Sequence, residues 1–257
     1  MPLTDATRTE IRNYLLQEAI RYITENLANL PAMETQPFHA RLMPALFGTA
    51  LSERSFSTRL GLWFQRMALL VARQFNRQAE MNYLVTGQVQ PAVEAQITAL
   101  IAQMDGPRPK RIPNRQRDTT QVIGLQYEGG TTRQVRSDLF VLRPDQSEVY
   151  FEMKTVKPNK NTFRDMKRDI LMIMAMCYQQ NAQAYAAMSY NPAGEGNVYT
   201  PDYNEFLELG TDLIVGRQFW NFIGDAQTYD ELLEIAQEVG TVTTPLIAAA
   251  NQQNQSG

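Results

Sequence analysis

Two carboxylates and one lysine in the middle of the chain have the types and spacing that phosphodiester hydrolysis requires. Glu152 and Lys154 lie two residues apart in an apolar run, so in a β-strand their side chains project from the same face. Asp138 lies in the preceding apolar run, and a hairpin that turns at Pro144-Asp145 would place it near Glu152. Two carboxylates can hold one or two Mg²⁺ ions, which neutralise the scissile phosphate and acidify a bound water, while a lysine positions or activates that water. The pattern therefore predicts a metal-dependent hydrolytic site.

The Glu-x-Lys tripeptide carries little information alone, because roughly one is expected by chance in a chain of this length. The residues around the tripeptide make it more informative. The pair lies on an apolar strand, Ser137 and Asp138 precede it on the neighbouring strand, and the whole lies within the one basic stretch of the sequence. An ordinary surface ion pair on an edge strand is the alternative interpretation.

Composition limits the other chemistries that the chain could carry out. The 257 residues include 44% hydrophobic residues but only one cysteine and one histidine. This length supports one large domain or two small ones with a real hydrophobic core. A disulfide framework, a zinc cluster or a triad with several histidines is excluded, because each needs residues that this sequence lacks.

The charges are distributed unevenly along the sequence. The formal net charge is −3, which would argue against a polyanionic partner. The window from Arg108 to Arg168, however, holds fourteen basic and seven acidic residues, so it carries +7 and the rest of the chain −10. All five lysines lie in this window, which we call the basic segment. Such a segment is expected where phosphates bind, although a solvated charged surface can also produce one.

Hydrophobic periodicity and turn residues predict the elements that position these side chains. Prolines and cations without an acid make residues 106–117 an expected exposed loop that becomes ordered on binding. Three strands, 121–127, 135–142 and 148–154, are expected to form an antiparallel meander. The remaining predicted elements are helices over 4–30, 56–75, 91–104, 162–180 and 229–239 and strands over 184–190 and 212–215.

This order of elements favours one α/β domain with a mixed sheet that contains an antiparallel meander and is flanked by helices. Within it we expect a helical N-terminal region over residues 1–105, a catalytic core over 106–250 and a polar, frayed tail over 251–257. Charged residues interrupt the N-terminus and no long apolar stretch occurs, so we expect a cytoplasmic protein without a membrane partner. No glycine-rich loop is present that could bind a nucleotide cofactor.

The arrangement of Asp138 followed by Glu152-Met-Lys154 resembles the core of the PD-(D/E)xK nucleases. Its surroundings resemble the TdeIII family of type II restriction endonucleases, and the resemblance extends from about Ser55 to Gly240. The runs that carry it are Ser55–Gly61 (SFSTRLG), Phe151–Lys160 (FEMKTVKPNK), Tyr190–Glu195 (YNPAGE), Gly216–Gly224 (GRQFWNFIG), Thr228–Leu233 (TYDELL) and Glu238–Gly240 (EVG).

The resemblance implies a restriction-endonuclease-like fold and Mg²⁺-dependent cleavage of double-stranded DNA at a short, near-palindromic GGNCC-like site, with 5′-phosphate products. It gives Asp138 and Glu152 the role of metal ligands and Lys154 that of activating the water. Ser137 replaces the proline usually found before the aspartate. Many related nucleases have a further carboxylate on an upstream helix, and its nearest counterpart here is Gln65, a candidate for a supporting role around the site.

Residues for contact with DNA are expected on both sides of this core. A GC-rich target calls for cations at guanine and for carboxylates at cytosine in the major groove. Arg133 and Arg136, like the loop at 108–117, are expected to contact the DNA backbone, because most protein–DNA hydrogen bonds do. The first candidates directly after the catalytic strand are Lys157, Asn159, Lys160, Asn161 and Arg164.

A near-palindromic target and one site per chain imply a homodimer, with the N-terminal helices as a hypothetical interface. A DNA methyltransferase of the same site is implied as a genetic rather than a physical partner. Two alternatives remain open from the residues alone. A structure-selective or repair nuclease could share this core, and a DNA-binding module could retain it in an inactive form.

Overall fold

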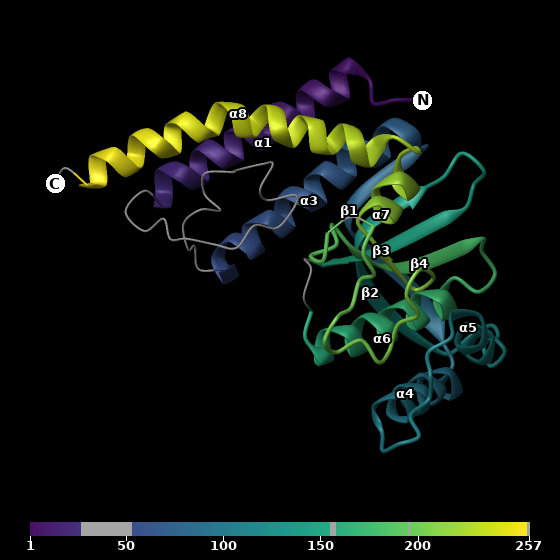
Figure 1. The fold of residues 1–257 in the computed structure, drawn as a ribbon. Helices are drawn as coiled ribbons and strands as arrows, with labels where there is room; N and C mark the ends of the chain where they lie inside the picture. The colour runs from purple at the N-terminus through teal and green to yellow at the C-terminus, as the bar shows by residue number, and fades with distance from the viewer. Residues whose placement is uncertain (27–52, 155–157, 195, 256–257) are drawn as a thin grey trace.

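Figure 1 shows the computed structural model of the chain, in which residues 1–26, 53–154, 158–194 and 196–255 are described. Twelve elements follow one another within these described residues. They are α1 (Asp5–Asn26), α3 (Glu53–Phe75), β1 (Gln78–Val89), α4 (Pro91–Asp105), α5 (Arg115–Ile123), β2 (Thr131–Leu142), β3 (Glu148–Lys154), α6 (Lys160–Met176), β4 (Ala182–Met188), β5 (Leu213–Val215), α7 (Arg217–Ile223) and α8 (Thr228–Gln255).

The five strands form one mixed sheet in the order β1-β2-β3-β4-β5. The first three strands are antiparallel neighbours, and β3, β4 and β5 run parallel to one another. In the register, Leu139 lies opposite Phe151, and Glu152 lies beside Ala186 of β4. The expected fold class, a mixed sheet with an antiparallel meander between helices, is confirmed.

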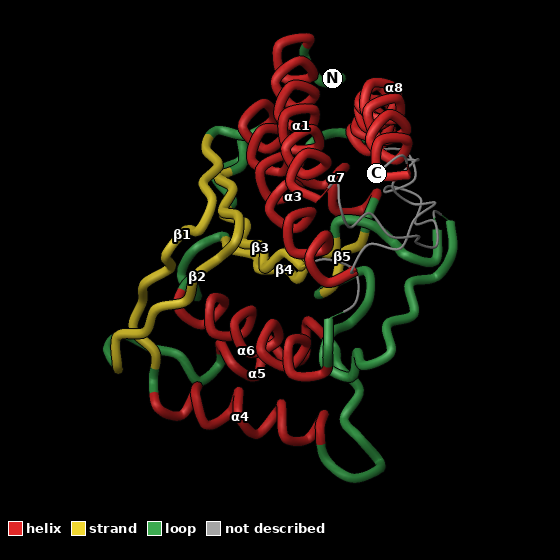
Figure 2. The backbone as a smooth tube through the Cα atoms, turned by 90° about the vertical axis from the view of Figure 1, so that its left-hand side faces the viewer, coloured by secondary structure: helices red, strands yellow, loops and turns green. Residues whose placement is uncertain are grey.

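Helices cover both faces of the sheet, and two hydrophobic cores result. Figure 2 shows α1, α3, α7 and α8 on one side and α4, α5 and α6 on the other. Side chains alternate along β3, so Phe151 and Met153 join the core under α3, while Tyr150 joins the core under α6. Glu152 and Lys154 share the face of Tyr150, and therefore the side of the sheet that α6 covers.

The helices α1 and α8 lie side by side although they come from the two ends of the chain (Figure 1). Ile11 and Leu15 of α1 are fully buried, and Arg8 forms ion pairs with Glu231 and Glu234 of α8. The region 251–257 was expected to be a frayed tail, but α8 continues to Gln255. None of the helices in the described part of the chain combines the length and the apolar character that a membrane crossing requires.

One expected strand was wrong and one strand was missed, and both errors lie in the meander. The segment 121–127 was expected to be its first strand, but residues 115–123 form the helix α5, because the Asn114 side chain caps the helix by accepting the Arg117 N–H. The first strand is instead β1, which lies within residues 1–105, the region expected to be helical. In β1 buried Val85 and Val89 alternate with polar residues, and the long pairing with β2 stabilises it.

Candidate active site

The β2–β3 hairpin brings Asp138, Glu152 and Lys154 together. Lys154 Nζ lies 2.5 Å from Glu152 Oε1 and 3.4 Å from Asp138 Oδ2. The three side chains are partly buried, with exposed fractions of 17% for Asp138, 20% for Glu152 and 35% for Lys154. The hairpin predicted from the sequence therefore places both carboxylates around one ammonium group at a site that solvent can reach.

Two side chains of β2 fix the geometry where the β2–β3 pairing ends. Beyond the Leu139–Phe151 pair, the buried Ser137 hydroxyl accepts the Phe151 N–H at 3.1 Å. Asp138 Oδ2 accepts the next free N–H of β3, that of Met153, at 2.7 Å. Side-chain oxygens thus replace backbone carbonyls at the splayed end of the hairpin, and the Asp138 carboxylate is oriented by the backbone of the strand that carries Glu152 and Lys154.

The electrostatics of the three residues favour an extra positive charge. Burial and the Asp138 charge raise the pKa of Glu152 to about 7, against the opposing effect of Lys154. Burial alone would lower the pKa of Lys154, but the charges of Glu152 and Asp138 outweigh it and raise that pKa. Two carboxylates in contact with a single lysine leave a residual negative charge that a divalent cation can neutralise.

The donor set fits a hard cation such as Mg²⁺. Asp138 Oδ1 and Glu152 Oε2 accept no hydrogen bond from the described residues, so each carboxylate retains an oxygen for an ion. The described part of the chain contains no group of three or more carboxylate, cysteine or histidine side chains arranged to bind one metal. An ion held by Asp138 and Glu152 would therefore keep several waters, as Mg²⁺ usually does in proteins.

Comparison with known proteins identifies the group to which this geometry belongs. Residues 3–240 match the family described as type II restriction endonuclease, HinfI. The chain belongs to the HinfI family of type II restriction endonucleases. Members of this class are site-specific deoxyribonucleases that act on double-stranded DNA and generally depend on a divalent metal, so the expected enzyme class is confirmed. Membership in the TdeIII family stays a prediction.

Similar proteins cover almost the whole chain. The type II restriction enzyme HgiCII of Herpetosiphon aurantiacus is 32% identical over 93% of this chain and 96% of its own length. HgiEI and HgiBI of the same organism are 31% and 30% identical over 93% of this chain and 95% of their own length. The match therefore includes α1, α3 and α8 as well as the sheet.

The HinfI-family endonuclease carries Gln65 on a helix across the sheet from Glu152 and Lys154. Gln65 lies on α3, whose apolar residues pack with Phe151 and Met153. Glu152 and Lys154 project from the opposite face, under α6. No described hydrogen bond or ion pair joins Gln65 to the three residues, and its supporting role stays a prediction.

A residue of α6 that the sequence did not bring to attention, Asp169, interacts electrostatically with the site. Asp169 is half-buried, and burial raises its pKa to about 6. Its charge contributes to the raised pKa of Glu152, and the charge of Lys154 in turn lowers that of Asp169. The available signal was an acidic residue within the apolar stripe of an amphipathic helix, between Met166 and Ile173.

The two arginines of β2 have different surroundings. Arg133 lies five residues from Asp138 along the strand, where it forms a two-pronged ion pair with Glu94 of α4 at 2.8 and 3.0 Å. Arg136 is exposed and donates to the Asn82 carbonyl of β1. Of these two candidates, Arg136 lies nearer to the site and its guanidinium is not in a described ion pair.

The candidates after β3 surround the start of α6. Lys157 lies outside the described residues. Asn159 caps α6, since its side chain accepts the Thr162 N–H, and Asn161 is exposed. Lys160 forms ion pairs with Asp105 and Glu205. Arg164 lies 3.7 Å from Asp165, and its buried Nε has no hydrogen-bond partner among the described residues.

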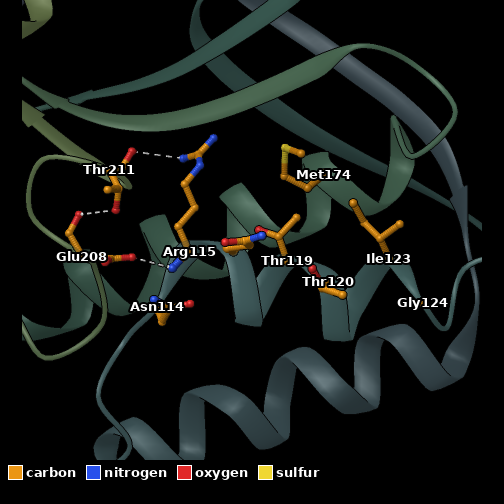
Figure 3. A pocket seen from close by; sticks show the side chains of 10 residues that line it. Asn114, Arg115, Thr119, Thr120, Ile123, Gly124, Met174, Glu208 and Thr211 are labelled. Atoms are coloured by element: carbon orange, nitrogen blue, oxygen red, sulfur yellow. Dashed lines mark hydrogen bonds between the residues drawn. The ribbon is translucent and has the colours of Figure 1, made fainter.

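The loop at 106–117 is bound to the protein more tightly than expected. Figure 3 shows Arg115 directed inward beside Glu208 and Thr211, on the wall of a cavity of about 630 Å³. Arg115 donates to the Ala184 carbonyl at 2.8 Å and lies over the Tyr185 ring. Arg111 pairs with the buried Asp118. The expectation of a loop that orders only on binding is wrong for its second half, because internal carboxylates already neutralise these cations.

Proposed function

We propose that this endonuclease hydrolyses phosphodiester bonds of double-stranded DNA in the cytoplasm with Mg²⁺ as its metal. The single observation that supports this most strongly is the position of Lys154, which lies between Asp138 and Glu152 at the solvent-accessible end of the hairpin. We assign the two carboxylates to the metal and Lys154 to the attacking water.

The proposed chemistry centres on these three residues and the metal. Bound Mg²⁺ would neutralise the scissile phosphate and lower the pKa of a coordinated water. Lys154 would hold the water in line with the phosphorus atom. A bond forms from the water oxygen to phosphorus, the bond from phosphorus to the 3′ oxygen breaks, and that oxygen takes up a proton, so a 5′-phosphate remains.

The proposed target is a short, GC-rich, near-palindromic sequence of the GGNCC type. Support comes from the resemblance of the Phe151–Lys160 run to the TdeIII family and from the cationic and amide side chains that follow β3. Lys157, Asn159, Asn161 and Arg164 are the proposed contacts there, with Arg136 on the DNA backbone. Lys160 and Arg133 can contribute only after exchanging their carboxylate partners for phosphates.

A two-fold target is cut on both strands most simply by a homodimer, and a DNA methyltransferase would protect the same sequence. We retain residues 106–250 as the catalytic core, to which β1 adds an edge strand from residues 1–105. Since α1 is packed against α3 and α8, only its outer surface is available for a dimer interface. Sedimentation of the full chain, alone and with a cognate duplex, measures the assembly.

The function is tested by incubating plasmid DNA with the protein and Mg²⁺ and sequencing the ends that result. We expect discrete fragments with 5′-phosphates at one recurring sequence. Lys154→Ala should abolish cleavage, whereas Arg21→Ala, which removes a surface ion pair with Glu18 on α1, should not. Cleavage by Lys154→Ala at the normal rate contradicts the assignment. Cleavage without sequence preference or at DNA junctions would favour a structure-selective or repair nuclease. Binding of DNA without cleavage would favour an inactive DNA-binding module.

A further inference from the structure

The helix α6 packs its apolar stripe against the sheet face that carries Asp138, Glu152 and Lys154, which we call the catalytic cluster after their proposed role. Met166, Ile173 and Met176 are buried at 9% exposure or less, and they lie three residues before and four and seven residues after Asp169. Residues at these intervals share one side of a helix. Asp169 is therefore an acidic residue in the apolar, sheet-facing stripe of α6.

The contact between α6 and the edge of the sheet confirms the direction of this stripe. Gly87 of β1 leaves no room for a side chain, because a Cβ atom there would lie 2.7 Å from Met176 Cβ. The stripe thus faces β1 and β2, and Asp138 projects from β2 on the same side. Asp169 lies two turns before Met176, toward the end of α6 that follows the catalytic strand.

Asp169 differs from the other acidic residue of the same helix face in having no partner. Asp165, one turn earlier, is exposed and forms an ion pair with Arg168 at 2.8 Å. Among the described residues, no hydrogen bond or ion pair to Asp169 is found, although it is half-buried. Burying a carboxylate without a partner costs stability, and such residues concentrate at functional sites.

The position of Asp169 relative to the cluster sets its role. It lies close enough to Glu152 and Lys154 to act on both electrostatically. The described residues nevertheless hold no group of three carboxylates arranged around one metal position. Asp169 thus faces the same side of the sheet as Asp138 and Glu152 without being grouped with them around one metal position, which leaves it a role through water rather than as a direct ligand.

We propose that Asp169 is a positioning residue that accepts hydrogen bonds from water molecules of the metal ion held by Asp138 and Glu152. The inference rests on the proposed function, because it assumes that these two carboxylates bind Mg²⁺. A hydrated Mg²⁺ ion presents several water donors. Removal of an acceptor that orients such groups around a metal typically lowers the affinity of the site for the metal by about 10- to 100-fold.

The test compares Asp169→Asn with the matched control Asp165→Asn, which removes an exposed, paired carboxylate from the same helix. Binding of Mn²⁺ to the DNA-free protein, followed by electron paramagnetic resonance of the free ion, gives a readout independent of cleavage. We expect affinity to fall about 10-fold or more in Asp169→Asn, to recover in Asp169→Glu and to stay unchanged in Asp165→Asn. Raised Mg²⁺ should restore cleavage by Asp169→Asn but not by Lys154→Ala.

The possible outcomes separate this inference from the function on which it rests. Wild-type Mn²⁺ affinity in Asp169→Asn, with normal cleavage by the wild type, overturns the role of Asp169 and leaves the proposed function intact. Absence of both metal binding and cleavage in the wild type overturns the proposed function itself. Thermal unfolding of each variant shows whether it is folded. If Asp169→Asn does not fold and Asp169→Glu does not restore folding, Asp169 has a structural role instead of the proposed one.

Discussion

Two ionic clusters of almost the same composition lie on either side of α6, and each holds one lysine between two carboxylates. In the catalytic cluster, Lys154 contacts Asp138 and Glu152. In the second, which we call the buried cluster, Lys167 lies 3.2 Å from Asp118 and 2.7 Å from Asp212.

The clusters differ in what completes them. All three members of the buried cluster are at most 1% exposed, and arginines close it, since Arg111 pairs with Asp118 and Arg115 with Asp212. Burial would raise the pKa of Asp118, but hydrogen bonds from Arg111 and the charge of Lys167 outweigh it and lower that pKa. No arginine closes the catalytic cluster among the described ion pairs, and the pKa of Glu152 is raised to about 7.

The comparison shows that residue types alone do not decide the role of such a triad. Where additional cations satisfy the carboxylates and water is excluded, the cluster links α5 and α6 to the residue that precedes β5. Where the carboxylates retain free oxygens and remain accessible, the missing charge can come from a metal ion. The following predictions test this difference, beginning with the largest effect.

Removing one carboxylate from each cluster should separate activity from stability. Asp138→Asn deletes a proposed metal ligand, so we expect a loss of about 10³-fold or more in the rate of Mg²⁺-dependent plasmid cleavage. Asp118→Asn should leave the rate per folded molecule within a few-fold of wild type while lowering the denaturation midpoint. A comparable rate loss in the two variants would mean that the buried cluster takes part in catalysis.

Removing the lysine should destabilise the protein more in the buried cluster than in the catalytic cluster. Lys167→Met leaves two buried carboxylates facing each other, so we expect the free energy of unfolding to fall by about 3–5 kcal/mol. Lys154→Met leaves carboxylates that water can reach, and a loss of about 1 kcal/mol is expected. Urea denaturation of the metal-free proteins measures both. Equal losses would contradict the distinction between an open and a closed cluster.

The stability of the metal-free protein should depend on pH through the catalytic cluster. The pKa of Glu152 is about 7 in the folded chain and near 4.5 when unfolded, so the folded state binds the proton more tightly. Its contribution to stability is thus full below about pH 4.5 and is lost as the pH rises to 7. Between pH 5 and pH 8 the wild type should therefore lose about 2 kcal/mol of unfolding free energy that Glu152→Gln does not lose. Urea denaturation of both proteins at pH 5 and at pH 8 measures this difference. An equal change in the two proteins would refute the raised pKa.

The smallest expected effect concerns the support of the catalytic hairpin. Ser137→Ala leaves the buried Phe151 N–H without the acceptor that it has at 3.1 Å, at a cost of about 1 kcal/mol. Asp138 follows Ser137 in the sequence, so we expect cleavage to slow as well. The effect should be smaller than in Asp138→Asn, because the carboxylate itself remains. Thr132→Ala, at the exposed start of β2, serves as a control in thermal unfolding. Unchanged stability of Ser137→Ala would mean that the backbone pairing continues without the hydroxyl.

Local patterns predicted the catalytic hairpin well and its surroundings poorly. The alternation in β2 and β3 and the turn at Pro144-Asp145 are local, so the approach of Asp138 to Glu152 followed from them. The strand predicted over 121–127 failed because the Asn114 cap and the burial of Asp118 favour a helix there. β1 was missed because its partner lies some fifty residues later.

The sequence by itself determined which groups the proposed chemistry can use, because the residue types and two-residue spacing on one strand set which groups share a face. It also determined the excess of cations between Arg108 and Arg168. Only the tertiary structure decided which of these cations remain available, since Lys167 and Arg115 meet carboxylates of distant segments. It likewise placed α3 and Gln65 on one face and α6 with Asp169 on the other. The physical reason is that burial and ion pairing depend on contacts between segments that no local pattern records.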